Sequence, residues 1–232
     1  MYCLRSSFTL KGAIMDKKMQ EQSQSWTQKD CHQFYQRFFK KSFEGTVPAL
    51  PFTSEQLYGM RADSYQRGYR AGYLRFLPSL TVAQLDTVYK LQHTAVLREN
   101  AAFRSVSTGE AGWACFMPAP FNVTKVIQTV MQMDGILDGL ADQYRMRSGE
   151  VALPNVAELM FLFLMETVYD ASWPHGRIIS AISSTVINDQ RLGLQVVSDG
   201  RMRLGLTFMP VHGPFEGDIL PIARYSSAKR IA

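Results

Sequence analysis

The chain has little cysteine for its 232 residues, and charged residues make up only 19% of it. Its three cysteines, Cys3, Cys31 and Cys115, are odd in number and far apart in the sequence. This spacing argues against a disulfide framework and against a zinc site built on a CxxC pair. We therefore expect a reducing, cytoplasmic environment.

Long hydrophobic runs are also missing. The most apolar run, Leu159 to Met165, lies between Glu158 and Glu166 and is far too short to span a bilayer, so it predicts a buried helix. Residues 1–14 lack the apolar core and the small-residue cleavage site of a secretory signal. Met15 is a candidate alternative start. We expect no association with a membrane.

The familiar motifs for phosphate, zinc and acyl chemistry do not occur. The sequence contains no Gly-x-Gly-x-x-Gly, Walker, HExxH or Gly-x-Ser-x-Gly pattern. Its four histidines stand singly, without the spacing of metal ligands: His32, His93, His175 and His212. These absences favour a protein without a cofactor or metal, and a non-enzymatic function.

One enzymatic alternative stays open. Cys115 follows Gly-Trp-Ala and could act as a hydrolase nucleophile, with His175 or His212 as the base. Such a thiol usually owes its low pKa to a helix N-terminus, whereas Pro118 follows Cys115 almost at once. We favour a buried structural cysteine in a short strand over residues 113–117.

Hydrophobic residues make up 46% of the chain, as in globular proteins, and the formal charge is +5. Residues 1–110 hold 15 Lys and Arg against 9 Asp and Glu, a net of +6, whereas the remainder is almost neutral. A basic first half suits a polyanion or an acidic partner.

The most informative segment runs from Thr53 to Pro78. A Thr53–Gln56 capping box predicts a helix start, and Pro78 predicts its end. On a helical wheel the aromatic side chains share one face, whereas the arginines lie outside it. The aromatic residues are Tyr58, Tyr65, Tyr69, Tyr73 and Phe76, and the arginines are Arg61, Arg67, Arg70 and Arg75.

This pattern has two interpretations. The rings could stack on bases while the arginines contact phosphates, with help from Lys40 and Lys41. Alternatively, the rings pack against a second helix over residues 82–104, and the arginines form a solvated face that can still contact a partner. We favour packing. The candidate nucleic-acid or partner-binding residues are Arg61, Arg67, Arg70, Arg75, Tyr69, Tyr73, Lys40 and Lys41.

The rest of the chain predicts helices first and strands last. Two helices joined by residues 78–80 should form an antiparallel hairpin, and later helices should cover residues 122–147 and 155–169. Asp199-Gly200, between the apolar runs 192–197 and 202–208, predicts a β-hairpin.

A further strand over residues 218–224 should extend the hairpin into an antiparallel meander. We predict an α+β fold: a flexible segment 1–25, a single domain 26–225 and a frayed tail 226–232. The helical part should cover about 26–170 and the β part about 176–225.

We therefore expect a self-associating interaction or assembly protein that acts through a mixed aromatic and basic surface. A nucleic-acid-binding accessory protein that uses the helix over residues 54–77 is the first alternative. The hydrolase that uses Cys115 is the second.

Overall fold

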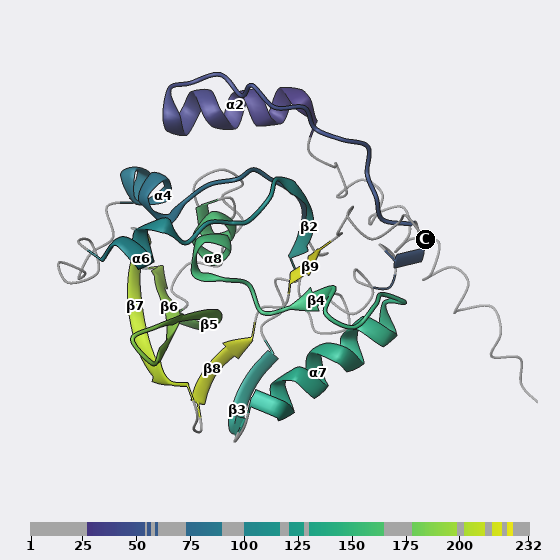
Figure 1. Cartoon of the computed structure of the whole chain (residues 1–232), viewed down its shortest axis with the longest axis vertical. Coiled ribbons are helices and arrows are strands. Elements are labelled where there is room, and N and C mark those ends of the chain that lie inside the picture. The colour runs from purple at the N-terminus through teal and green to yellow at the C-terminus, as the bar shows by residue number, and fades with distance from the viewer. Residues whose placement is uncertain are drawn as a thin grey trace, which may run out of the picture.

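The computed structural model describes residues 27–53, 55–56, 59, 73–89, 100–116, 121–127, 130–164, 178–198, 202–211, 215–219 and 222–224. Helices dominate the N-terminal part and antiparallel sheets the C-terminal part (Figure 1), which confirms the predicted α+β class. The predicted flexible segment and frayed tail lie outside the described residues.

The described helices are short. They are α2 (Gln28–Phe39), α4 (Val82–Tyr89), α6 (Ala101–Ser105), α7 (Val130–Gln143) and α8 (Val156–Phe163). None of the helices in these ranges combines the length and apolarity needed to cross a membrane.

Capping boxes start several helices, as their sequences predict. In the box of Thr53, the Gln56 side chain accepts from the Thr53 backbone N–H at 3.0 Å. The Thr53 hydroxyl accepts in return from the Gln56 backbone at 3.2 Å. Thr27 with Asp30, Thr81 with Gln84 and Asn155 with Glu158 form the same reciprocal pair of bonds. Each box satisfies two backbone donors that the helix itself leaves unpaired.

Two sheets are present among the described residues. The four-stranded sheet has the order β1 (Tyr73–Leu77), β2 (Gly112–Phe116), β9 (Ile222–Arg224), β4 (Val151–Ala152), and all its pairs are antiparallel. The five-stranded sheet has the order β3 (Phe121–Ile127), β8 (Phe215–Ile219), β5 (Ile178–Ile187), β6 (Gln190–Ser198), β7 (Met202–Pro210). Its pairs are antiparallel except for β5 with β8, which is parallel.

The meander β5–β6–β7 confirms the predicted C-terminal hairpin. Strands β6 and β7 pair from Gln190 with Pro210 to Ser198 with Met202, in continuous register. The predicted turn at Asp199-Gly200 lies outside the described residues. The turn between β5 and β6 uses Asn188 and Asp189, whose positive φ angles of 51° and 57° suit a tight hairpin.

The predicted helix from Thr53 to Pro78 is wrong in its last part. Residues 73–77 form strand β1, so residues 78–80 join a strand to α4 rather than two helices. The steric effect of Pro78 on Leu77 favours extended backbone, which a strand satisfies as well as a helix end does. The pairing of β1 with β2 over five residues then outweighs the helical spacing of Tyr73 and Phe76.

Other boundaries also differ from the prediction. The predicted helix over residues 82–104 is not continuous, because Asn100 has extended backbone and caps the separate helix α6. The predicted helix over residues 122–147 is strand β3 followed by α7, because Val123, Thr124, Val126 and Ile127 are β-branched residues that favour a strand. The predicted strand over residues 218–224 is divided between β8 and β9. These strands lie in different sheets, so β9 does not extend the meander.

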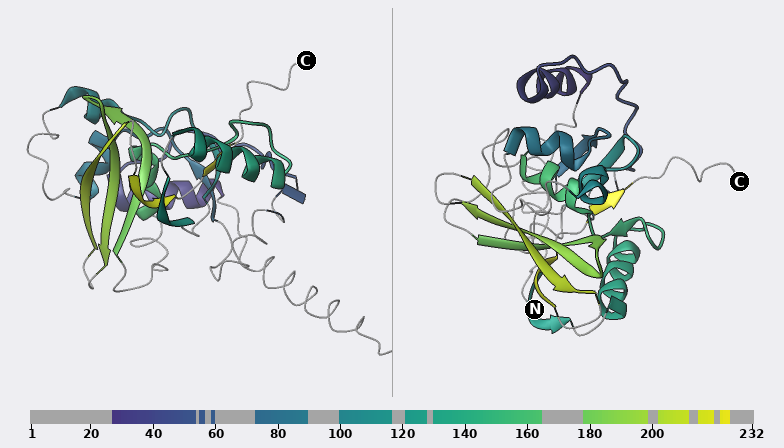
Figure 2. Two further views of the ribbon diagram at one scale, coloured as in Figure 1. Left: turned by 90° about the horizontal axis from the view of Figure 1, so that it is seen from below. Right: turned by 60° about the vertical axis from the view of Figure 1, so that its left-hand side comes forward.

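The buried interior is centred on α8, whose eight residues are all buried. This helix packs against α4 and against β5 and β6. One cluster of buried hydrophobic residues includes members of the helices and of both sheets. In Figure 1 and in the right-hand view of Figure 2, α8 lies between α2 on one side and the five-stranded sheet on the other.

Helix α2 is attached to this interior by aromatic side chains. The Phe34 ring is fully buried and lies 5.5 Å from the Phe161 ring of α8, centroid to centroid. The segment after α2 is held by the Trp113 indole, whose Nε1 donates to the Pro48 carbonyl at 2.9 Å. Burial raises the pKa of the Cys31 thiol on this helix to about 12.

Candidate functional site

Strand β7 is the longest edge strand in the part of the chain that the structure describes. It is nine residues long and pairs with β6 alone, so no described strand covers its outer edge (Figure 1). The edges at β1 and β4 are shorter, with five and two residues. The edge at β3 has seven residues, and its pairing with β8 is irregular between Val123 and Ile127.

An unpaired edge presents backbone N–H and C=O groups that can bind another strand. Proteins commonly blunt such edges with lysines, prolines, bulges or short strands. The sequence of β7 has one charged residue, Arg203, and its single proline, Pro210, stands at its last position. Its pairing with β6 has no register shift over nine residues. The strand therefore keeps a long and regular edge.

The side chains along β7 add apolar surface beside this edge. Phe208 is 49% exposed, the largest exposed fraction among the large hydrophobic residues of the described structure. Its neighbours Leu206 and Met209 are partly buried and pack against the hydrophobic cluster. Phe208 lies opposite Leu192, which is fully buried, so the sheet supports this ring from the β6 side.

A close approach between β6 and β7 holds the edge strand in place. A Cβ atom on Gly193 of β6 would lie 2.5 Å from Thr207 Oγ1 and 2.7 Å from Met209 Cε. It would also lie 3.1 Å from the carbonyl oxygen of Ala181 on β5. The absence of a side chain at Gly193 therefore lets Thr207 and Met209 lie over β6.

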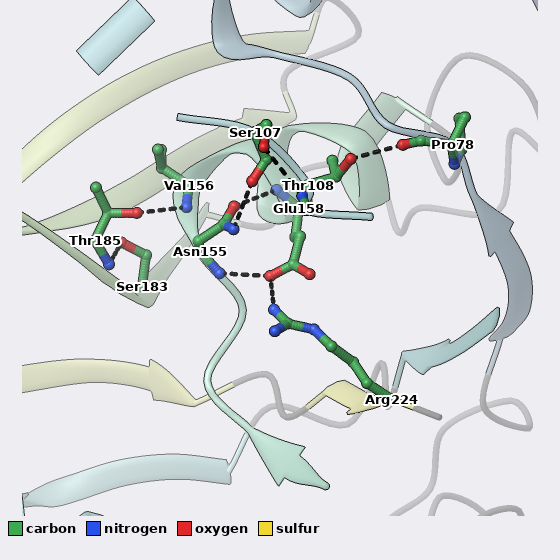
Figure 3. Close-up of polar contacts among 10 residues, drawn as sticks. Pro78, Ser107, Thr108, Asn155, Val156, Glu158, Ser183, Thr185 and Arg224 are labelled. Atoms are coloured by element: carbon green, nitrogen blue, oxygen red, sulfur yellow. Dashed lines mark hydrogen bonds and ion pairs between the residues drawn. The ribbon is translucent and has the colours of Figure 1, made fainter. Parts of the chain in front are cut away.

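A second candidate is the buried polar cluster at the N-terminus of α8 (Figure 3). Glu158 has no exposed surface, and its Oε2 accepts from the backbone N–H of Asn155 at 2.7 Å and from Nη2 of Arg224 on β9. The Asn155 side chain donates to the carbonyl of Ser107 at 2.8 Å, and Thr185 on β5 accepts from the backbone N–H of Val156 at 2.9 Å. The cluster thus connects α8 to both sheets.

Burial dominates the electrostatics of Glu158. Loss of hydration raises the pKa of its carboxyl group, although the charge of Arg224 and the hydrogen bonds from Asn155 and Arg224 oppose this effect. Glu158 Oε1 and Arg224 Nε are buried and have no hydrogen-bond partner among the described residues. A carboxylate this enclosed has no contact with solvent, so its geometry suits a structural junction rather than substrate binding.

The polar cluster extends across the meander. The Ser183 hydroxyl donates to the Leu192 carbonyl at 2.5 Å, and Arg191 Nη1 donates to the Ser183 carbonyl at 3.0 Å. Burial lowers the pKa of Arg191, and the carboxylate of Asp134 on α7 partly opposes that change. These contacts hold β5 against β6, the strand that pairs with β7.

Some of the predicted site residues lie in different elements of the fold, and the others lie outside the described residues. Arg61, Arg67, Arg70 and Tyr69 lie outside the described residues. Tyr73 and Arg75 belong to strand β1 rather than to a helix. Lys40 and Lys41 are exposed at the C-terminal end of α2, where the Lys40 ammonium donates to the Arg37 carbonyl at 3.2 Å.

Cys115 lies in the middle of the four-stranded sheet. Strand β2 pairs with β1 on one side and with β9 on the other, and Cys115 faces Leu74 and Ala223 in register. Its exposed fraction is 2%, as expected of a structural cysteine and not of an accessible nucleophile. The possible bases His175 and His212 lie outside the described residues.

No group of three or more potential metal ligands occurs within the described ranges. The acidic row Asp134, Asp138 and Asp142 is exposed along α7, and Asp138 accepts a 2.7 Å hydrogen bond from the Ser148 hydroxyl. This is the solvated face of an amphipathic helix.

Sequence reasoning did not identify the edge of β7 as a surface. The strand itself was predicted from its apolar alternation. Its position at the edge was not, because sequence does not show which strand a meander leaves unpaired.

Comparison of the chain with protein-family models, with curated proteins and with solved structures found no match.

Proposed function

We propose that this chain is a non-enzymatic interaction protein that binds a strand of another polypeptide along the outer edge of β7. The observation that carries the proposal is the regular, nine-residue edge of β7, which no described strand covers, with the half-exposed ring of Phe208 beside it. Addition of a strand to a sheet edge is a general mode of protein recognition. Backbone hydrogen bonds supply the affinity, and alternate side chains supply the specificity.

The setting of β7 supports this role. Gly193 and the buried contacts of Ser183 and Arg191 hold the sheet behind the edge, so a partner would meet a preformed strand. A preformed binding surface avoids the entropic cost of ordering it on association.

A lysine placed on the edge tests this proposal. Phe208→Lys adds charge and removes the exposed ring, and we expect it to weaken partner binding at least about tenfold. Binding is measured by capture from a cell extract with the immobilised chain, and each captured protein, including this chain itself, is identified by mass spectrometry.

Val186→Lys is the matched control. Val186 is 43% exposed but lies on β5, which pairs with neighbours on both sides. We expect it to bind like the wild-type chain. If every captured protein binds the two lysine variants equally, and both are folded by circular dichroism, the β7 edge is not the binding surface.

A second candidate function is nucleic-acid binding, and three exposed cations favour it. Arg37, Lys40 and Lys41 gather at the C-terminal end of α2, and Arg37 stands over the Phe38 ring at 5.3 Å from its centroid. Cations beside an aromatic ring suit contact with a phosphate backbone and bases.

Salt dependence tests this second candidate. If phosphates are bound, affinity for single-stranded DNA or RNA should fall steeply with salt, and Arg37→Gln with Lys41→Gln should reduce the salt slope by about two. Lys40 is left unchanged because its ammonium also donates to the Arg37 carbonyl, so a substitution there would alter the end of α2 as well. Absent or salt-independent binding would eliminate this function.

A further inference from the structure

Resting on the proposed function, we infer that the partner of β7 is β7 of a second copy of this chain. The two strands run antiparallel about a twofold axis at Leu206, so that two five-stranded sheets join into one continuous sheet. Leu206 is the midpoint of Met202–Pro210, and it is therefore the one centre at which all nine residues of each strand find an opposite residue.

The sequence of β7 is complementary to itself in this register. Leu206 faces its own copy, Leu204 faces Phe208, and Gly205 faces Thr207. Arg203, the one charged residue of the strand, faces Met209, so no like charges are opposed. Pro210, which has no N–H to donate, lies at the end of the ladder, where a proline is tolerated.

The exposed ring of Phe208 gains a partner in this arrangement. On its own strand it is 49% exposed, and in the dimer its register position is directly opposite Leu204 of the second copy. Large apolar side chains directly opposite each other across an antiparallel pair are a stabilising combination. Two such pairs form for each dimer, because the axis repeats the contact.

Pairing in this register produces a dimer rather than an extended array. A twofold contact uses the β7 edge of both copies and leaves no further β7 edge to extend the array. Pairing of β7 with β3 of another copy would instead leave open ends and form fibres. The register irregularity of β3 between Val123 and Ile127 makes that edge a poorer template than the regular edge of β7.

Cysteine cross-linking of the purified full chain tests the register. In a Cys3→Ser background, Leu206→Cys should cross-link to itself through a short bismaleimide, because the two sites face each other. Met202→Cys should not, because its two copies lie eight residues apart, roughly 27 Å at about 3.4 Å per residue. Mixing Met202→Cys with Pro210→Cys should restore the cross-link. Cys31 and Cys115 are buried, with exposed fractions of 1% and 2%, and serve as unreactive background thiols.

Sedimentation of the purified chain supplies an independent measurement, so the test does not depend on a cysteine variant that folds poorly. We expect a dimer for the wild type and for Val186→Lys, and a dissociation constant at least about tenfold higher for Phe208→Lys. A strict monomer, or a dimer that Phe208→Lys leaves unchanged, would overturn the inference.

The outcomes separate this inference from the proposed function. A monomeric chain that captures a different protein in a Phe208-dependent manner overturns the second copy as partner but leaves the β7 edge as the binding surface. A dimer that cross-links at Met202→Cys alone, rather than at Leu206→Cys, overturns the register. Long polymers in place of dimers would show that β7 pairs with another edge.

Discussion

Glu158 places an acidic group where no water reaches it. Its carboxylate has one oxygen bonded to Asn155 and Arg224 and one oxygen without a partner. Because the Arg224 side chain is 42% exposed, the arginine keeps much of its hydration while the carboxylate has lost its own. Burial therefore raises the pKa of Glu158 above its usual value, although Arg224 and the Asn155 hydrogen bond oppose this change.

This imbalance predicts how stability changes with pH. A carboxyl group with a raised pKa in the folded state contributes stability that is fully present below its unfolded pKa. That contribution is lost as the pH rises through the folded pKa. The free energy of unfolding should therefore contain a component that falls as the pH rises above about 4.5, with a slope of at most one proton.

Glu158→Gln should remove that component. Glutamine keeps an oxygen that can accept from the Asn155 backbone, and Arg224 can turn towards solvent. We expect the variant to gain stability relative to the wild type as the pH rises, measured by denaturant unfolding between pH 4 and pH 8. Glu110→Gln, at an exposed position, is the control and should leave the pH dependence unchanged. A variant that instead loses relative stability as the pH rises would contradict this account.

At the scale of elements, the contact between β6 and β7 depends on the missing side chain of Gly193. Gly193→Ala should cost about 1–3 kcal/mol of unfolding free energy, because the added methyl group meets Thr207 Oγ1 and the Ala181 carbonyl. In a Thr207→Ala background the cost should shrink by about 1 kcal/mol, because one of the obstructing atoms is gone. A thermal or denaturant double-mutant cycle measures both values.

Gly139→Ala on α7 is the matched control for this substitution. No atom lies within 4 Å of a Cβ built there, and the position is exposed. Alanine should stabilise that helix by up to about 1 kcal/mol, the opposite sign to its effect at Gly193. Equal effects at the two glycines would show that the packing of β6 against β7 does not depend on Gly193.

Local signals in the sequence predicted the elements that depend on neighbouring residues. The Thr53 capping box forms as expected, because such a box is complete within four residues. The burial of α8 and of Cys115, and the strand over residues 112–116, also followed from apolar runs.

The elements that were missed depend on distant partners. Tyr73–Leu77 keeps helical spacing in its aromatic residues, and its extended state is fixed by β2, more than thirty residues later. Phe121–Ile127 likewise becomes a strand by pairing with β8 near the end of the chain. The candidate site was missed for the same reason. A strand forms the edge of a sheet when no further strand pairs with it, and such pairing depends on segments far away in the sequence.

At the scale of the molecule, the two sheets are joined through α8 and its polar cluster. Arg224 on β9 in the four-stranded sheet and Thr185 on β5 in the five-stranded sheet both bond to the first turn of this helix. A strand added at β7 would extend the five-stranded sheet on the side away from this junction. Partner binding at β7 and the Glu158–Arg224 pair therefore occupy separate parts of the fold.

The position of β9 has a consequence for the folding of the newly synthesised chain. Residues 222–224 lie between β2 and β4, although they follow every other described element in the chain. Until residues 222–224 are in place, β2 has only β1 beside it, β4 lacks its described partner strand, and Glu158 lacks its ion pair with Arg224. Completion of the four-stranded sheet is therefore a long-range folding step, which can occur only after β2, β4 and residues 222–224 have all been synthesised.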